Sequence, residues 1–284
     1  MSGCVLDRVE GDGVAELVEC GDRTAGVSWF HKALSGPLAE LVRQEERAEY
    51  GVHSGTSIRQ SEGSRRTHIN HLGRNRSRLD EELEKSPELA VAEFYGEDVL
   101  ARVECSCFAV ECSCFAVEGE WSRFVVALQA GMSRLSDAEY CTALVDFFAQ
   151  ALDELNPMFA RIERDSFSDW SNIEAALTRD LDESLPEGRD FLRGYAWVTV
   201  CPQELALRLG GPQSLAASGV FHRVVPLQAG GVLLQASETL SGYTDQVMER
   251  VFTVLAPVLP EGQPVPDPAH PNLRFVLRDA SQVR

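Results

Sequence analysis

A chain of 284 residues, 44% hydrophobic and 25% charged, has the composition of a folded protein with its own core, which excludes a wholly disordered polypeptide. No apolar run reaches the length of a membrane-spanning helix, and the N-terminus has neither the basic nor the apolar region of a secretory signal. We therefore expect a cytoplasmic protein that does not bind membranes.

The net charge of −18 belongs to one part of the chain. Residues 1–78 carry 11 acidic and 11 basic side chains, so residues 79–284 hold the whole excess of acid. An acidic field repels nucleic acid and anionic membranes and attracts basic partners. Acidity also keeps a protein soluble, and the charge alone does not separate these two interpretations.

The first 78 residues predict little folded structure. One amphipathic helix is expected over residues 37–50. Residues 51–78 are rich in Ser, Gly, Arg and Asn and almost free of apolar side chains, which predicts a disordered linker. We therefore expect a small or marginal N-terminal segment at 1–50, a linker at 51–78 and a folded domain at 79–284.

The first part of that domain mixes helix and strand signals. Ser86 and Pro87 predict the start of a helix that ends near Tyr95. Residues 99–117 favour β-structure. Residues 120–135 carry an apolar stripe at helical spacing, although the run FVVAL within them makes a strand the competing interpretation.

The clearest helix begins at Ser136 and ends before Pro157. Ser136 and Glu139 have the spacing of a capping box, in which each side chain accepts a hydrogen bond from the other residue's backbone N–H. Several apolar residues then recur on one face of the predicted helix. A buried amphipathic helix is the expected result.

Residues 159–284 show regular start and stop signals. In chain order we expect a strand at 159–164, a helix from Ser168 or Ser171 to about residue 181, a buried strand at 194–201, short helices beginning at Pro202 and Pro212, a hairpin of strands at 220–227 and 232–237, a helix from Tyr243 to Leu255, and an edge strand at 273–277. These elements predict an α+β fold, a mostly antiparallel sheet covered by helices on one face, with a disordered or loosely packed N-terminal segment.

A tandem duplication is the most unusual feature of the sequence. VECSCFA occurs at residues 103–109 and again at 110–116, which groups four cysteines: Cys105, Cys107, Cys112 and Cys114. Four thiolates suit tetrahedral zinc, but side chains alternate along a strand and seven is odd, so the two pairs would face opposite sides. They converge only if the chain turns back near residues 109–111, which contain no turn-forming residue. We favour a duplication inside a strand, with one copy displaced into a loop or bulge, and assign no metal.

Other reactive side chains are weaker candidates. Cys141 and Cys201 are expected to be reduced core residues. His68 and His71 lie in the predicted linker, and His222 is a candidate general base with no nucleophile near it in sequence. No G-x-S-x-G, P-loop, G-x-G-x-x-G or H-E-x-x-H motif occurs.

Two groups of charged residues are further candidate sites. The acidic pairs are Asp153 with Glu154 and Asp180 with Asp182 and Glu183, and acids adjacent in sequence usually mark a solvated face. The basic group is Arg65, Arg66, Arg74, Arg76 and Arg78. Without aromatic residues between the arginines, we expect this group to fold over the acidic domain or to remain disordered rather than to contact nucleic acid.

The last hundred residues resemble a known kind of bacterial protein. From residue 194 the chain reads GYAWVTVCPQELALRLGG, then LAASGVFHRVVPLQAGGVLLQASETL, then VFTVLAPVLPEGQP. This pattern resembles the C-terminal half of uncharacterised actinobacterial proteins that are similar to immunity proteins of bacterial polymorphic toxins. The resemblance lies mainly in residues 194–280 and brings no catalytic residue with it.

These observations favour a non-enzymatic protein-binding protein, of the immunity type, that neutralises a basic partner. No catalytic, cofactor-binding or metal-binding residue is assigned, and no cofactor is expected. The alternative is an enzyme of unrecognised type in which carboxylates near the sheet edge act as acid and base.

Overall fold

The structure is a computed structural model that describes residues 134–164, 170–268 and 271–283. Nearer the N-terminus it describes six strands, for which only the backbone is considered, and the residues Lys32, Ser77, Arg78 and Glu81.

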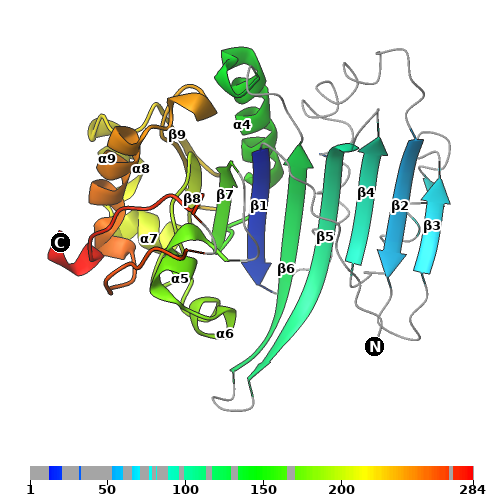
Figure 1. Ribbon diagram of the computed structural model, residues 1–284, viewed down its shortest axis with the longest axis horizontal. Coiled ribbons are helices and arrows are strands. Elements are labelled where there is room, and N and C mark those ends of the chain that lie inside the picture. Colours follow the sequence, from blue (N-terminus) through cyan, green and yellow to red (C-terminus); the bar gives the residue numbers. More distant parts are fainter. Residues whose placement is uncertain are drawn as a thin grey trace.

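One antiparallel sheet organises the chain. Its ten strands follow the order β3-β2-β4-β5-β6-β1-β7-β8-β10-β9 (Figure 1). They are β1 (Gly13–Cys20), β2 (His53–Arg59), β3 (Arg66–Asn70), β4 (Leu89–Tyr95), β5 (Val99–Cys112), β6 (Val117–Leu128), β7 (Phe159–Glu163), β8 (Val198–Cys201), β9 (Arg223–Pro226) and β10 (Val232–Gln235). All neighbouring strands run antiparallel, and the predicted α+β class is confirmed.

The first strand of the chain lies in the middle of the sheet. β1 pairs with β6 on one side, with Leu17 opposite Phe124, and with β7 on the other, with Val14 opposite Glu163. This central strand was missed by the sequence analysis, because residues 13–20 lie in the segment predicted to be small or marginal. Strand pairing therefore crosses the boundaries predicted at residues 50 and 78.

Strands β2 and β3 correct the linker prediction at the residues they occupy. β2 pairs with β4 and with β3. The low apolar content of residues 51–78 suggested that they could not contribute to a core. In a sheet, however, backbone N–H and C=O groups pair with the neighbouring strand whatever the side chains are.

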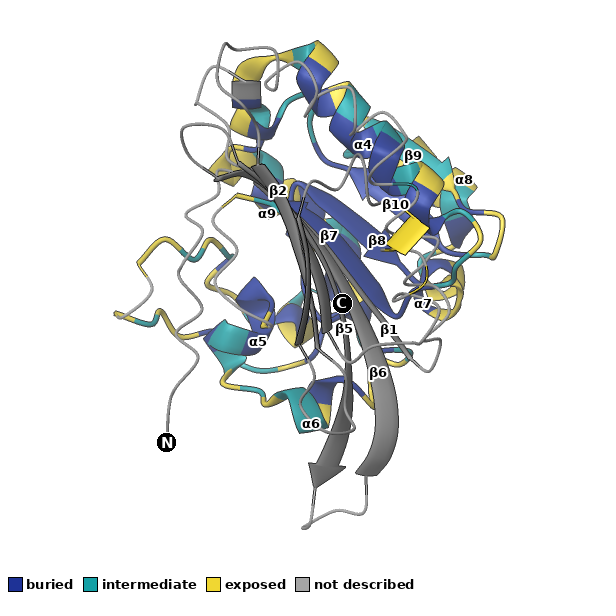
Figure 2. Cartoon of the chain, turned by 90° about the vertical axis from the view of Figure 1, so that its right-hand side faces the viewer, coloured by how far each residue is buried: buried dark blue, intermediate teal, exposed yellow. Residues whose placement is uncertain are grey.

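The described helices gather at the β7–β9 end of the sheet (Figure 1). They are α4 (Ala138–Leu152), α5 (Asn172–Leu177), α6 (Leu181–Ser184), α7 (Gln203–Arg208), α8 (Gly211–Ala217) and α9 (Asp245–Leu255), with short 3₁₀ turns η1 (Arg134–Ser136), η2 (Leu240–Gly242), η3 (Ala256–Val258) and η4 (Ala280–Gln282). Figure 2 shows β7, β8 and β10 buried among them. Large aromatic side chains fill this core: Phe147, Phe148, Phe159, Tyr195, Trp197 and Phe252.

Two helices predicted between residues 86 and 135 are wrong, because strands form in both segments. Residues 86–95 were expected to form a helix, but β4 occupies their end and pairs with β2 and β5. Residues 120–135 contain most of β6, so the competing strand interpretation is confirmed there. Both segments contain aromatic and β-branched residues, and the neighbouring strands decide the outcome because β-structure depends strongly on context.

The cap of α4 also differs from its prediction. Asp137 Oδ1 accepts hydrogen bonds from the backbone N–H groups of Glu139 at 2.9 Å and Tyr140 at 3.4 Å. Ser136 belongs to the preceding turn η1, so the predicted Ser136–Glu139 capping box is wrong although the helix is confirmed. A capping box does form at the next helix, where Ser171 and Glu174 satisfy each other's backbone N–H groups.

Several C-terminal predictions are confirmed, with shorter elements than expected. The helices after Pro202 and the hairpin formed by β9 and β10 lie where predicted. The helix capped by Ser171 ends at Leu177 because Thr178 has a left-handed backbone with φ 52°. The edge strand predicted at residues 273–277 is wrong, because no strand forms in that described stretch. The helix predicted at 37–50 lies outside the described residues.

Candidate functional site

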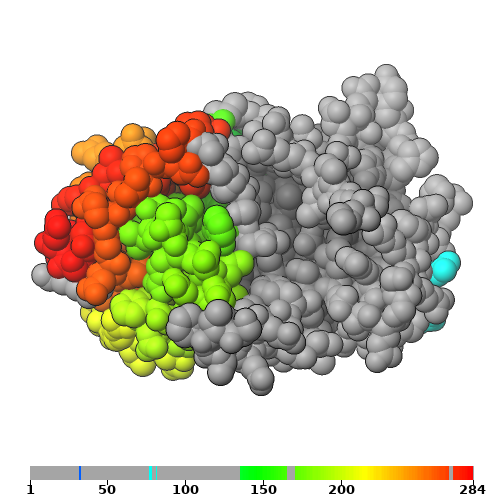
Figure 3. Space-filling model, turned by 60° about the horizontal axis from the view of Figure 1, so that its bottom comes forward, coloured from blue at the N-terminus to red at the C-terminus, as the bar shows by residue number. Residues whose placement is uncertain are grey.

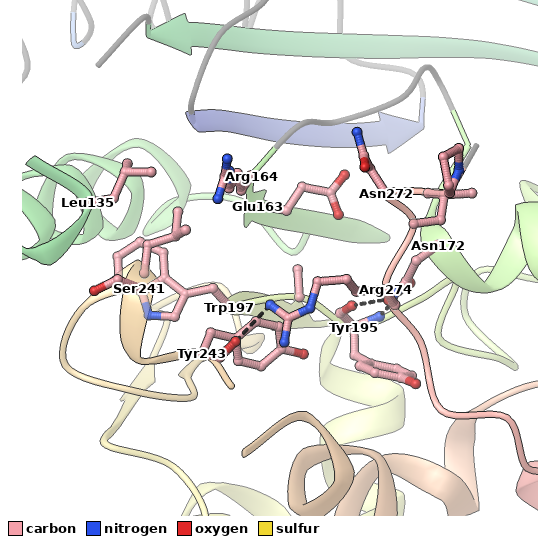
Figure 4. Close-up of a pocket in the computed structure, with 14 residues that line it drawn as sticks. Leu135, Glu163, Arg164, Asn172, Tyr195, Trp197, Ser241, Tyr243, Asn272 and Arg274 are labelled. Carbon is pink, nitrogen blue, oxygen red and sulfur yellow. Dashed lines mark hydrogen bonds between the residues drawn. The ribbon is translucent and has the colours of Figure 1, made fainter. Parts of the chain in front are cut away.

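A cleft of about 520 Å³ lies where several separate segments of the chain meet (Figure 4). These are the turn η1, the end of β7, the start of α5, the residues leading into β8, the turn η2 and the C-terminal stretch 271–274. Its volume falls in the usual range of roughly 300–1,000 Å³ for small-molecule sites. Charged and aromatic side chains share its walls, among them Glu163, Trp197, Tyr243 and Arg274.

Two buried residues fix the C-terminal wall of the cleft. The Asn172 amide donates to the carbonyl oxygens of Tyr195 at 2.9 Å and Arg274 at 2.8 Å. The Tyr195 hydroxyl accepts a hydrogen bond from the Val276 N–H at 2.8 Å, and burial raises the pKa of Tyr195. These bonds replace the strand pairing predicted for residues 273–277 and hold the segment against the core.

The Arg274 side chain is oriented by two bonds. Its guanidinium donates to the Tyr243 carbonyl oxygen and to Asp245 Oδ1, both at 2.7 Å. The same group lies over the Tyr243 ring, 5.4 Å from its centroid. A guanidinium has five N–H donors, so further donors remain for a bound group.

Tyr243 contributes a mostly buried polar side chain to the cleft wall. The residue is only 8% exposed, and its buried hydroxyl has no hydrogen-bond partner among the described residues. Burial raises its pKa well above the usual value of 10, so the phenol stays neutral and can donate a proton in a hydrogen bond. A hydroxyl left unsatisfied in the interior costs about 1–3 kcal/mol.

Glu163 stands on the opposite wall from Arg274 (Figure 4). It is the last residue of β7, and its Oε1 lies 2.9 Å from Nε of Arg161, whose side chain is almost completely buried. This ion pair favours the charged carboxylate at the cleft wall.

A second buried ion pair supports the segment that carries Asn172. Glu174 Oε1 lies 2.5 Å from Arg193 Nε, and Oε2 lies 3.0 Å from the second nitrogen of the same fork. Ser171 donates its hydroxyl to the Arg193 carbonyl oxygen and its N–H to Glu174 at 2.6 Å. Burial would raise the pKa of Glu174, but the Arg193 charge and these hydrogen bonds hold it below its usual 4.5.

A group of acidic side chains lies at the surface around α6, in the part of the chain drawn in light green in Figure 3. It consists of Asp180, Asp182 and Glu183, which we call the α6 acidic group. Asp180 and Glu183 are exposed and Asp182 is half-buried. Within the described residues none of the three forms an ion pair, whereas the following arginines each pair with an acid: Arg179, Arg189, Arg223, Arg274 and Arg278.

The other predicted candidates lie apart from the cleft. Asp153 accepts hydrogen bonds from the Gln228 backbone at 3.0 Å and its side-chain amide at 2.6 Å, which ties the end of α4 to the hairpin. His222 is exposed ahead of β9 and does not line the cleft. Cys141 and Cys201 are free and buried, as predicted, and burial raises the pKa of both thiols.

The cysteine duplication lies in a continuous strand for most of its length. β5 runs through Cys112, and its pairing with β6 is unbroken to the pair formed by Cys112 and Val117. The chain therefore does not turn back at residues 109–111, as four converging thiolates would require. Residues 113–116 lie outside the described part, and within that part no group of three or more His, Cys, Asp or Glu side chains could hold a metal.

Sequence reasoning missed the residues that form the cleft. Glu163 and Tyr243 were counted only toward the pattern of a strand and of a helix, and Arg274 lay in a predicted edge strand. Their positions are far apart in sequence and belong to no common motif, so no local signal brings them together.

The chain matches no family model, and no curated protein or solved structure is significantly similar to it. Among the helices that the structure describes, none is both long and apolar enough to cross a bilayer.

Proposed function

We propose that this chain is a cytoplasmic, non-enzymatic binding protein of the immunity type, which captures a basic protein through its acidic surface. The observation that carries the proposal is the α6 acidic group, which faces solvent without an ion-pair partner among the described residues. Five described arginines are paired with other acids, and among the described residues no cation is paired with these carboxylates, so their charge is available to a partner.

The physical advantage of such a surface lies in the rate of association. Complementary charges steer encounters and can raise the association rate constant by one to three orders of magnitude at low salt. The chain's net charge of −18 extends this field beyond the contact itself. Binding of this kind weakens as salt screens the field, over a Debye length of about 10 Å at 0.1 M.

The test is capture from a lysate of the source cells with the immobilised full chain, at low and high salt. A triple variant (Asp180→Asn, Asp182→Asn, Glu183→Gln) removes the α6 acidic group. A control variant (Glu139→Gln, Glu238→Gln, Glu261→Gln) removes three exposed acids elsewhere, so both variants lose the same charge.

We expect a basic protein that is retained at low salt and released at high salt. Its purified form should associate about ten-fold more slowly with the α6 variant and within two-fold of the unmodified rate with the control. Equal slowing by both variants would show a general charge effect. Retention of no basic protein at low salt would overturn the proposal.

A further inference from the structure

Strands β5 and β6 run past the end of the sheet and form a two-stranded arm. β4 pairs with β5 only as far as Ser106, and β1 pairs with β6 only from Trp121 onward. Beyond these points, among the described strands, β5 and β6 pair only with each other, up to the pair of Cys112 and Val117. Figure 1 shows the two strands continuing together below the rest of the sheet. We call residues 107–112 and 117–120 the arm.

The second copy of the duplicated heptad accounts for most of the arm. It occupies residues 110–116, and the strand register pairs Ala109 with Glu120. Without that copy Ala109 would be joined directly to Val117, and the same register would leave a loop of three residues that ends in Gly119. Three-residue hairpin loops commonly end in a glycine with a left-handed backbone. One copy therefore suffices to close the hairpin, and the second copy extends it beyond the sheet.

The outer edges of the arm have no strand partner among the described strands, and the β5 edge, residues 107–112, is the longer of the two. Proteins usually protect such edges with proline, lysine or a covering element, and a two-stranded ribbon is only marginally stable by itself. The arm contains no proline and no lysine. Its backbone N–H and C=O groups can therefore pair with a third strand, which would stabilise the arm.

Charge decides which kind of strand fits. The arm contains three acidic residues, Glu111, Glu118 and Glu120, and no basic residue. Helix α6, which carries the α6 acidic group, contacts β5. A second copy of this chain would bring the same acidic residues together, and like charges repel. An extended segment rich in lysine or arginine is complementary to both acidic groups.

We propose that the arm binds an extended, basic segment of the captured protein, which pairs its backbone with an outer edge of the arm as an added strand. Because side chains alternate along a strand, basic residues at every second position would share one face of the added strand. That arrangement allows them to reach the α6 acidic group beside β5. This inference rests on the proposed function, since the arm and the α6 acidic group would bind the same partner.

The test is fluorescence anisotropy, in reducing buffer, with a labelled peptide of alternating lysine and valine whose two ends are blocked. A second peptide has the same sequence and a methyl group on every backbone nitrogen, so it keeps the charge but cannot donate backbone hydrogen bonds. We expect the full chain to bind the first peptide. The methylated peptide should bind at least about ten-fold more weakly, because the added strand loses its N–H donors.

A deletion of residues 110–116 locates the binding site. It removes most of the arm and one acidic residue, Glu111, and keeps the residues through which β5 pairs with β4 and β6 with β1. Glu261→Gln is the matched control, because it removes one exposed acid and leaves the arm intact. We expect the deletion to weaken binding of the unmethylated peptide at least about ten-fold and the control to change it less than about two-fold. An unchanged urea midpoint by circular dichroism would show that the deletion variant is folded.

Four results would overturn the proposal. The first is no binding of the unmethylated peptide, the second is equal affinity for the two peptides, and the third is equal affinity of the deletion variant and Glu261→Gln for the unmethylated peptide. The fourth is sedimentation of the full chain as a dimer that the deletion makes monomeric, which would show that a second copy occupies the arm.

Capture of a basic protein from lysate separates this inference from the proposed function. Equal retention by the deletion variant and the full chain would exclude the arm from the interface and leave the proposed function standing. Retention of no basic protein by the full chain would overturn both.

Discussion

The ion pair between Glu174 and Arg193 joins two segments that frame the cleft. Both side chains are at most 2% exposed, and the carboxylate accepts two bonds from the guanidinium and one from the Ser171 N–H. Burying two charges is costly, and the cost is offset only when their hydrogen bonds are well satisfied. The pair therefore stabilises the fold as a unit, and loss of one member leaves a buried charge alone.

Replacement of Glu174 by Gln should lower the free energy of unfolding by about 3–5 kcal/mol, measured by urea denaturation at pH 7. The pKa of Glu174 is depressed in the folded state, so its contribution is complete above the usual value of 4.5 and is lost as pH falls through the lower folded value. The unmodified chain should therefore lose stability in acid more steeply than Glu174→Gln.

Glu187→Gln is the control for that substitution. Its partner is Arg179, at 2.5 Å, but the Glu187 side chain is about half exposed. An exposed ion pair contributes roughly 0–1 kcal/mol. A loss of stability as large for Glu187→Gln as for Glu174→Gln would contradict the role assigned to burial.

At the scale of elements, the adjacent residues Ser136 and Asp137 are the two candidates for the N-cap of α4, and substitution of each distinguishes them. Asp137→Ala should lower the free energy of unfolding by about 1 kcal/mol, because two backbone N–H groups lose their acceptor. Ser136→Ala should change it by only a few tenths of a kcal/mol. Chemical denaturation of the two variants decides, and a larger loss for Ser136→Ala would restore the capping box predicted from sequence.

Local sequence signals correctly predicted those elements whose start or turn is marked by a few neighbouring residues. The N-cap serine expected at Ser168 or Ser171 and the hairpin signal at Gln228 to Gly231 each act over a few residues, and a helix capped by Ser171 and the hairpin both formed. β4 was mistaken for a helix because Ser86 and Pro87 have the form of a helix start, and the apolar residues of β6 fit both the helical and the strand period. Only pairing with distant strands resolves that ambiguity, and a single sequence contains no record of the partners.

The cleft could not be predicted from the sequence for a related reason. Its lining combines residues near positions 135, 163, 172, 196, 242 and 273, each of which looks like ordinary helix, strand, turn or loop sequence. Tyr243 gains its unusual position from burial under Arg274, thirty-one residues later in the chain. The charge excess of residues 79–284, in contrast, could be read directly from composition.

At the scale of the molecule, the sheet makes residues 79–284 dependent on the segment before them. Without β1, the facing edges of β6 and β7 lose their shared partner. A fragment of residues 79–284 should therefore unfold at a lower urea concentration than the full chain and aggregate more readily, because unpaired strand edges favour association. Circular dichroism and light scattering measure the two effects.

Deletion of residues 1–11 is the control, since it removes chain but leaves β1 intact. It should leave the unfolding midpoint close to that of the full chain. A fragment of residues 79–284 as stable and monomeric as the full chain would contradict the central position of β1.

The place of β1 also bears on the order in which the protein can assemble during synthesis. β1 leaves the ribosome before both of its partners, which begin at residues 117 and 159. At about 5–20 residues per second, the ribosome takes several seconds to complete the first partner. Throughout that interval the backbone of residues 13–20 has no native neighbour, which makes this stretch a natural target for chaperones that bind nascent chains.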